Sequence, residues 1–301
     1  MKKTHTELFQ DLVLAGWEMR KGHNDEGESQ SAPMPPKGTV RTIKIPKAAI
    51  SVLLEMEQIK DAGFVDYYIM AFWIFRQYAT SAGIEVWARG AVPSSMVCYC
   101  LGLTEVDPVK YGLHSVRFVN DELPKFQFDI EASRFDEFMK GAEDLLQANA
   151  KEYDIPAIRE CLFKDVKPYE YLSKKQERPL PENIDDELAR YALSFPQTMD
   201  LYETYVQNPK CDIIIYQEQM LDILKETFHI PGIKANQIRL SIQRGDVEQV
   251  EAYKQEIFSN LQDLTPKKAE AAWQRLTSNP KAFLKAHAVS RVMASYMHEI
   301  K

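Results

Sequence analysis

Residues 125–131 alternate strictly between polar and apolar side chains. Phe126, Phe128 and Ile130 fall on one face of an extended segment, and the polar side chains between them fall on the other. A period of two is the pattern of a β-strand with one buried face. Since the segments on both sides have helical spacing, the sequence predicts an α+β fold for this part of the chain.

The pattern of apolar residues changes along the chain and divides it into two parts. In the first part, helical segments are interspersed with strands expected at 84–87, 113–119 and 125–130. The stretch 164–186 is rich in proline and charge and is typical of an exposed linker. Beyond it we expect only helices, at 187–193, 217–228, 247–262, 266–277 and 280–299.

The N-terminal segment combines a short helix with a polar tether. Residues 8–19 have the apolar spacing of an amphipathic helix, and 21–37 are rich in Gly, Ser, Asp, Glu and Pro. The helix is therefore either a detachable docking element or a frayed end of the chain.

The overall charge limits which parts of the surface can bind nucleic acid. Its 37 basic and 44 acidic side chains give a formal net charge of -7. Phosphate contacts supply most of the affinity of nucleic-acid binders, so this sign disfavours DNA binding over the whole surface. A local basic groove remains compatible with it.

Cysteine usage and the N-terminus indicate a cytoplasmic protein. The four cysteines, Cys98, Cys100, Cys161 and Cys211, lack the spacing of a zinc site or a disulfide framework, so we expect reduced thiols. No apolar segment follows the first charged residues as in a secretory signal. The apolar stretch 67–75 is about half as long as a membrane span, so we expect no membrane partner.

Asp129 and Glu131 lie one residue apart on the same face of the predicted strand. Two carboxylates placed in this way can share a divalent metal ion, and pairs of such ions catalyse nucleotidyl transfer. Acidic residues on an exposed strand face also occur simply because charged side chains keep a protein soluble. From the spacing alone, both interpretations stay open.

Two blocks of sequence carry a family resemblance. The first consists, in chain order, of Gly63-Phe64, Gly83, Arg89-Gly90, Leu101-Gly102-Leu103-Thr104, Asp107-Pro108, Arg117-Phe118-Val119-Asn120 and Phe128-Asp129-Ile130-Glu131. The second consists of Ala192-Leu193, Pro196, Tyr216-Gln217-Glu218-Gln219-Met220, Ile238-Arg239, Phe283-Leu284-Lys285-Ala286-His287-Ala288 and Ser295-Tyr296. In this order and spacing, both resemble the bacterial DNA polymerase III alpha subunit, the C-family replicative polymerase.

The resemblance implies a polymerase-β-like palm, a small mixed sheet with helices, followed by an all-α fingers-like domain. The expected division is a helix and tether at 1–45, the palm at 46–160, a linker at 161–185 and the fingers at 186–301. It also implies a site. Asp129 and Glu131 would be catalytic residues that bind Mg²⁺, and the residues that bind phosphate or nucleotide would be Arg89, Gly90, Arg117, Arg239, Lys285 and His287. For Arg89 and Arg117 a solvated ion pair is an equal alternative, and for His287 a structural role is another.

Several positions depart from the family pattern. Ala91 replaces the serine expected after Gly90, Pro93 removes one N–H donor from the following turn, and Glu131 replaces an aspartate. No segment between Glu131 and Ala192 matches the strand that should carry a third acid. In the second block Phe195 replaces an arginine, and 243–246 replace a lysine cluster. The flanking domains of the family have no counterpart, so a truncated and degenerate copy with doubtful Mg²⁺ occupancy is expected.

These observations favour a catalytically impaired DNA polymerase III alpha-like protein. It would act as an accessory that binds DNA, a nucleotide, or a protein of replication or of a mobile element. The first alternative is an active metal-dependent nucleotidyltransferase that takes its third acid from Asp107 or Asp136. The second alternative is a protein-interaction module with no nucleic-acid role. Whether the chain is an enzyme stays open, with the departures weighing against it.

Overall fold

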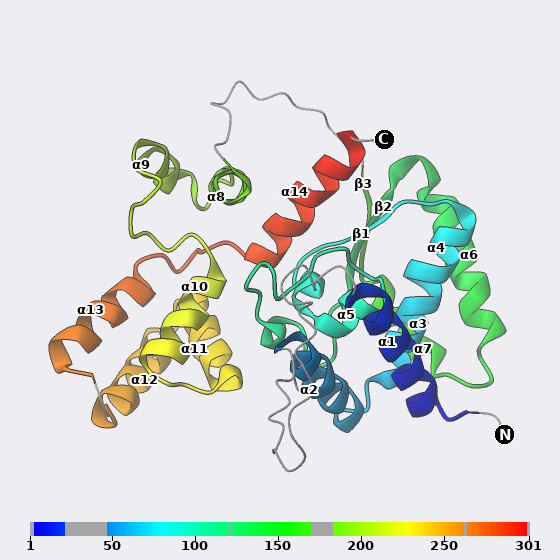
Figure 1. Ribbon diagram of the computed structural model, residues 1–301, viewed down its shortest axis with the longest axis horizontal. Coiled ribbons are helices and arrows are strands. Elements are labelled where there is room, and N and C mark those ends of the chain that lie inside the picture. The colour runs from blue at the N-terminus through cyan, green and yellow to red at the C-terminus, as the bar shows by residue number, and fades with distance from the viewer. Residues whose placement is uncertain (1–2, 22–46, 121, 170–182, 262–263, 300–301) are drawn as a thin grey trace, which may run out of the picture.

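The computed structural model describes residues 3–21, 47–120, 122–169, 183–261 and 264–299 (Figure 1). The predicted tether from residue 22 onward and residues 170–182 of the predicted linker lie outside the described residues. The described chain is mostly helical with one three-stranded sheet, which confirms the predicted α+β class.

The sheet is small and mixed, with the strand order β1-β2-β3. Its strands are β1 (Val86–Ala88), β2 (Gln127–Glu131) and β3 (Asp165–Tyr169). β2 lies in the centre, antiparallel to β1 and parallel to β3. The alternation around Phe128 therefore predicted the central strand correctly, to within two residues.

The predicted strand at 113–119 is wrong. The segment forms a 3₁₀ turn, η3 (Ser115–Arg117), in which the Arg117 N–H bonds to His114 O and the Phe118 N–H bonds to Ser115 O. These local bonds use the backbone groups that a strand would offer to a neighbour. The apolar residues of so short a segment did not distinguish the two structures.

The start of the predicted linker is also structured. β3 follows α7 (Ile155–Phe163), a helix that the sequence analysis did not identify, and pairs along its whole length with β2. Pro168 is compatible with this strand because β3 is at the edge of the sheet, where a missing N–H costs no ladder bond.

Helices cover the apolar face of the sheet, and Figure 1 shows α4 and α6 on the side of the strands opposite α14. The Phe128 ring stacks on Phe75 with centroids 4.0 Å apart, and Phe75 in turn stacks on Phe138. The hydrophobic core that contains Phe128 also includes buried residues of α2 (Lys47–Asp61), α3 (Val65–Ala71), the π-helix η1 (Phe72–Tyr78), α4 (Ala79–Ala82), α5 (Met96–Cys100) and α6 (Phe135–Ala148).

The N-terminal helix α1 (His5–Lys21) is packed into this core, rather than frayed. Phe9 and Val13 are fully buried against it. A Cβ atom on Gly16 would lie 1.8 Å from the carbonyl oxygen of Cys100, so the two backbones approach too closely for any side chain at residue 16.

The second part of the chain is helical, as predicted. It comprises α8 (Ile184–Leu193), η5 (Met199–Leu201), α9 (Tyr202–Gln207), α10 (Gln217–Asp222), η6 (Ile223–Thr227), α11 (Gly232–Arg244), α12 (Val247–Ser259), α13 (Pro266–Thr277) and α14 (Lys285–Glu299). Figure 1 shows α10 to α13 gathered away from the sheet and α14 returning to it. The carboxylate of Glu218 accepts hydrogen bonds from the N–H groups of Lys285 and Ala286, which anchors the start of α14 to α10.

In the described part of the chain, every helix falls short of the length and apolar character that crossing a membrane requires.

Candidate functional site

Asp129 lies on the polar face of the central strand and is almost completely buried, with 2% of its surface exposed. The Arg89 Nε atom donates a hydrogen bond to Asp129 Oδ1 at 3.0 Å. Arg291 forms an ion pair with the other oxygen, Oδ2. Burial raises the pKa of Asp129, and both guanidinium groups oppose that rise because they favour the charged carboxylate.

Arg291 reaches Asp129 because α14 crosses the polar side of the sheet beside β1 (Figure 1). Next to it, Ser290 Oγ donates a hydrogen bond to the Ala88 carbonyl oxygen of β1. The Arg291 guanidinium also lies 4.4 Å from the centre of the Tyr169 ring of β3. Three contacts with different strands thus fix α14 over the carboxylate.

Glu131 does not share the surroundings of Asp129. Its Oε1 atom accepts a hydrogen bond from Ser133 Oγ in the turn after β2. Of the alternative acids, Asp107 accepts hydrogen bonds from two backbone N–H groups of its own turn, and Asp136 lies in the first turn of α6. Within the described ranges, no three His, Cys, Asp or Glu side chains are grouped for a metal ion.

A strand next to β2 does exist, although the sequence analysis found no match for it. β3 brings Asp165 opposite Gln127, on the same face as Asp129. Gln127 Nε2 donates to Asp165 Oδ2 at 3.3 Å, and Arg89 Nη2 lies 4.0 Å from Asp165 Oδ1. Directly opposite Asp129, β3 carries Lys167, whose side chain is exposed and is not a metal ligand.

Gly90 is required at its position by its backbone and by its surroundings. Its φ is +62°, and a Cβ atom there would lie 1.6 Å from Gln127 Oε1. The Gly90 N–H donates a hydrogen bond to His287 Nδ1 at 3.1 Å. Burial, assisted by the nearby charges of Arg291 and Arg89, lowers the pKa of His287 to about 4, so the ring is neutral and can accept this bond.

Arg117 and Arg239 form a second cluster, and their hydrogen-bond acceptors are neutral amides. Gln217 Oε1 accepts from Arg117 at 2.7 Å and from Arg239 at 3.1 Å. Asn236 Oδ1 also accepts from both. Burial lowers the pKa of both guanidiniums, that of Arg239 to about 9, which leaves both groups charged at neutral pH.

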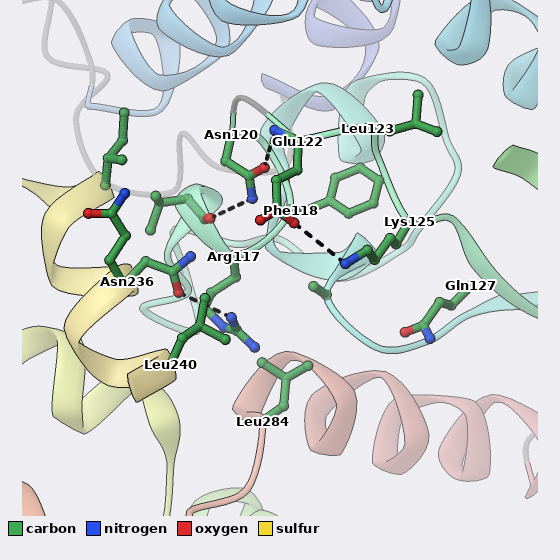
Figure 2. Close-up of a pocket in the computed structure, with 14 residues that line it drawn as sticks. Arg117, Phe118, Asn120, Glu122, Leu123, Lys125, Gln127, Asn236, Leu240 and Leu284 are labelled. Atoms are coloured by element: carbon green, nitrogen blue, oxygen red, sulfur yellow. Dashed lines mark hydrogen bonds and ion pairs between the residues drawn. The ribbon is translucent and has the colours of Figure 1, made fainter. Parts of the chain in front are cut away.

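A cavity of about 350 Å³ opens beside Arg117. Figure 2 shows Arg117 pointing between α11, which carries Asn236 and Leu240, and the start of α14, which follows Leu284. The buried Nε atom of Arg117 has no hydrogen-bond partner within the described part of the protein. We call this space the Arg117 cavity.

A second cavity of about 440 Å³ adjoins the first, because both are bordered by Gln127 and Leu284. We call it the Gly90 cavity. It is lined by two cationic side chains, several amides and the apolar residues Pro280, Ala282, Phe283 and Leu284, and the described residues around it include no acid. Its polar lining consists of Arg89, Gly90, Gln127, Gln197, Gln217, Gln243, Lys281 and His287.

Two of the predicted phosphate-binding residues border neither cavity. Arg239 is fully buried behind Gln217 and Asn236. Lys285 points elsewhere, with Nζ donating to the Tyr111 carbonyl oxygen at 2.8 Å.

The sequence analysis missed Arg291, Gln217 and Gln243 as site residues. The spacing of His287 and Arg291 was an available signal, since residues four apart share one face of a helix.

Comparison with known proteins bears on this arrangement. Residues 39–149 match the family described as the bacterial DNA polymerase III alpha NTPase domain. This region is DNA polymerase III alpha-like. The matched region includes Asp129, Glu131, Arg89, Gly90 and Arg117, so the resemblance predicted from sequence is confirmed there.

Individual relatives are polymerases of the same kind. The chain is 37% identical over 141 residues to an error-prone DNA polymerase of Bdellovibrio bacteriovorus, covering 46% of this chain and 11% of that protein. It is 38% identical over 98 residues to an error-prone DNA polymerase of Cutibacterium acnes, covering 32% and 9%. It is 36% identical over 94 residues to a DNA polymerase III subunit alpha of Mycobacterium tuberculosis, covering 30% and 8%. The chain thus matches about a tenth of the length of these relatives.

Proposed function

We propose that this DNA polymerase III alpha-like chain binds a nucleotide in the Gly90 cavity without transferring nucleotides, as an accessory in DNA replication or mobile-element biology. In this proposal the palm-like unit, predicted at 46–160, extends through β3 to residue 169, and 186–301 are a fingers-like unit. The observation that carries it is the lining of the Gly90 cavity, which combines Arg89, Lys281 and several amides with no acid among its described residues.

The electrostatics of the cavity favour an anion. Cations in a partly desolvated cleft attract phosphate more strongly than the same groups do on an open surface. Arg117 and Arg239 add two buried positive charges on one side, with neutral acceptors only in direct contact. The buried carboxylate of Glu218 offsets part of this charge, and a phosphate group would offset more of it.

The dimensions favour a nucleotide over a long nucleic acid. Ligand sites for small molecules are commonly about 300–1,000 Å³. The Gly90 cavity, at about 440 Å³, and the adjoining Arg117 cavity, at about 350 Å³, fall in this range. The net charge of -7 works against tight binding of a duplex across the surface.

The surroundings of Asp129 and Glu131, the acidic pair that the family resemblance predicts to be catalytic, support a loss of nucleotidyl-transfer activity. Asp129 is engaged by two guanidiniums, and Glu131 is turned to Ser133. Ala91 offers no hydroxyl next to Gly90, and the Gly90 N–H is already bonded to His287. Electrostatic stabilisation of the transition state is the main contribution of a polymerase site, and removing one such contact costs about 100-fold or more in rate.

A direct binding experiment tests the first half of the proposal. Fluorescence anisotropy of a labelled dATP should show saturable binding to the wild-type chain. Lys281→Gln should weaken it about tenfold, because it removes a charge from the cavity wall. Lys267→Gln, an exposed residue at the start of α13, is the matched control and should leave binding unchanged. Equal affinities of the wild type and of Lys281→Gln for dATP would show that the nucleotide does not bind in the Gly90 cavity.

Primer extension tests the second half. With a primer–template and all four deoxynucleotides, the wild-type chain should add no nucleotide in Mg²⁺ or in Mn²⁺. Extension that Asp129→Ala abolishes would instead establish an active nucleotidyltransferase.

A further inference from the structure

We infer that guanidinium groups take the place of metal ions at Asp129, so that the Gly90 cavity receives its ligand as a metal-free anion. The ligand part of this inference rests on the proposed function. The metal part does not, because it concerns only the surroundings of one carboxylate.

The first step is that both oxygens of Asp129 are engaged by cations. Arg89 Nε contacts Oδ1 at 3.0 Å, and Arg291 is ion-paired with Oδ2. The side chains of Asp129, Arg89 and Arg291 are 3%, 12% and 15% exposed. A divalent ion could coordinate either oxygen only in competition with the guanidinium already bound to it, and a displaced guanidinium would lose a charged partner in a buried position.

The second step is the charge of this group. Two guanidiniums and one carboxylate leave a net charge of +1 around Asp129. Asp165 compensates only weakly, since its oxygen is 4.0 Å from Arg89 and its side chain is 39% exposed. Such a cluster repels a divalent cation and attracts an anion.

The third step is that the positive charge faces the cavity. Arg89 borders the Gly90 cavity and contacts Asp129 at the same time. An anion in the cavity would therefore find a guanidinium at the position where a polymerase presents a metal ion. Ion pairs and hydrogen bonds with guanidinium groups suit phosphate oxygens well.

The fourth step is that the remaining acids do not rebuild a metal site. Glu131 accepts from Ser133, and Asp165 accepts from Gln127. No trio of potential metal ligands is brought together in the ranges that the structure describes. The donor set that the family resemblance implies for Mg²⁺ therefore does not fit the residues present.

Titration with Mn²⁺ tests the metal part. The electron paramagnetic resonance signal of free Mn²⁺ should be the same in the presence of the wild-type chain, of Asp129→Asn and of the exposed control Glu248→Gln. A site in the wild type that holds Mn²⁺ at micromolar concentration and is lost only in Asp129→Asn would overturn the inference.

Calorimetric titration of dATP, once in EDTA and once in excess Mg²⁺, tests the ligand part. We expect binding in EDTA and an affinity at least threefold lower in Mg²⁺, because Mg²⁺ neutralises part of the polyphosphate charge. Asp129→Asn should bind dATP in EDTA more tightly than the wild type, since the carboxylate no longer competes for Arg89. Binding that requires Mg²⁺ would overturn the inference while leaving nucleotide binding intact. Absence of binding in both conditions would overturn the proposed function, and the Mn²⁺ titration would then decide the metal part alone.

Discussion

The Nδ1 atom of His287 accepts a hydrogen bond from the N–H of Gly90, 3.1 Å away and 197 positions earlier in the chain. The family resemblance assigns both residues to phosphate binding. In this chain they bind each other and join α14 to the turn after β1. A phosphate at Gly90 would have to compete with the imidazole for the N–H group, which favours contacts from side chains such as Lys281 instead.

His287 should make the stability of the protein depend on pH. Its pKa is about 4 in the folded chain against 6.5 in the unfolded one, so between these values only the unfolded state binds a proton. The free energy of unfolding therefore gains, from this residue, up to about 1.4 kcal/mol per pH unit as the pH rises from 4 to 6.5. Urea unfolding of His287→Gln at pH 4.5, 5.5 and 6.5 should show a smaller pH slope than the wild type. An unchanged slope would mean that the imidazole is not buried as a neutral acceptor.

Glu55 should make the free energy of unfolding fall as the pH rises, which is the opposite of the effect of His287. This buried residue of α2 accepts hydrogen bonds from Ser95 Oγ and from the Met96 and Val97 N–H groups at the start of α5. Burial raises its pKa from 4.5 to about 7, so the folded state binds the extra proton between these values. Its contribution to stability is complete below pH 4.5 and is lost as the pH rises through 7.

As the pH rises from 4.5 to 6.5, Glu55 lowers the free energy of unfolding of the wild type and His287 raises it. Glu55→Gln removes the first of these effects, so its free energy of unfolding should rise with pH more steeply than that of the wild type. A flat or falling profile between pH 4.5 and 6.5 would contradict the assignment.

Gly16 should be intolerant of any side chain. Gly16→Ala places a methyl group against the Cys100 carbonyl and forces α1 away from α5, at a cost of about 3 kcal/mol in the free energy of unfolding. Ala15→Ser, on the exposed side of the same helix, is the control and should change stability by about 0.5 kcal/mol or less. Comparable stability of Gly16→Ala and the wild type would show that α1 is not docked in this way.

Gly90→Ala should be destabilising for two separable reasons. A left-handed backbone conformation costs a non-glycine residue about 1–2 kcal/mol, and the new methyl group also meets the Gln127 side chain. In a Gln127→Ala background the second cost disappears, so the same substitution should be less harmful there. Equal losses in both backgrounds, measured by urea unfolding, would exclude the contact with Gln127.

Elements with a strong periodic pattern were predictable from the sequence. The helices α6 and α13 and the strand β2 each have one apolar face, and each faces the core in the structure. The segment 113–119 was mistaken for a strand because it is short and rich in apolar residues, although its backbone bonds within its own turn. β3 was missed because a proline and several charges are compatible with a strand only at a sheet edge, which no local pattern reveals.

The candidate site was only partly predictable for the same reason. Asp129, Arg89, Gly90 and His287 were named from the resemblance, and the structure brings them together. Arg291 looks like any charged residue of an exposed helix until α14 is placed against the sheet. The neutralisation of Asp129 is a tertiary relationship between positions far apart in the chain, and sequence periodicity carries no information about it.

The most direct test of the account is a double-mutant cycle between Asp129 and Arg291. The free energies of unfolding of the wild type, Asp129→Asn, Arg291→Gln and the double variant should be measured in EDTA. We predict that each single variant loses about 3 kcal/mol, because it leaves a buried charge without its partner, and that the double variant loses less than the sum. Asp129→Asn at least as stable as the wild type, with no coupling to Arg291, would contradict the account, since that is the behaviour of a carboxylate kept free for metal.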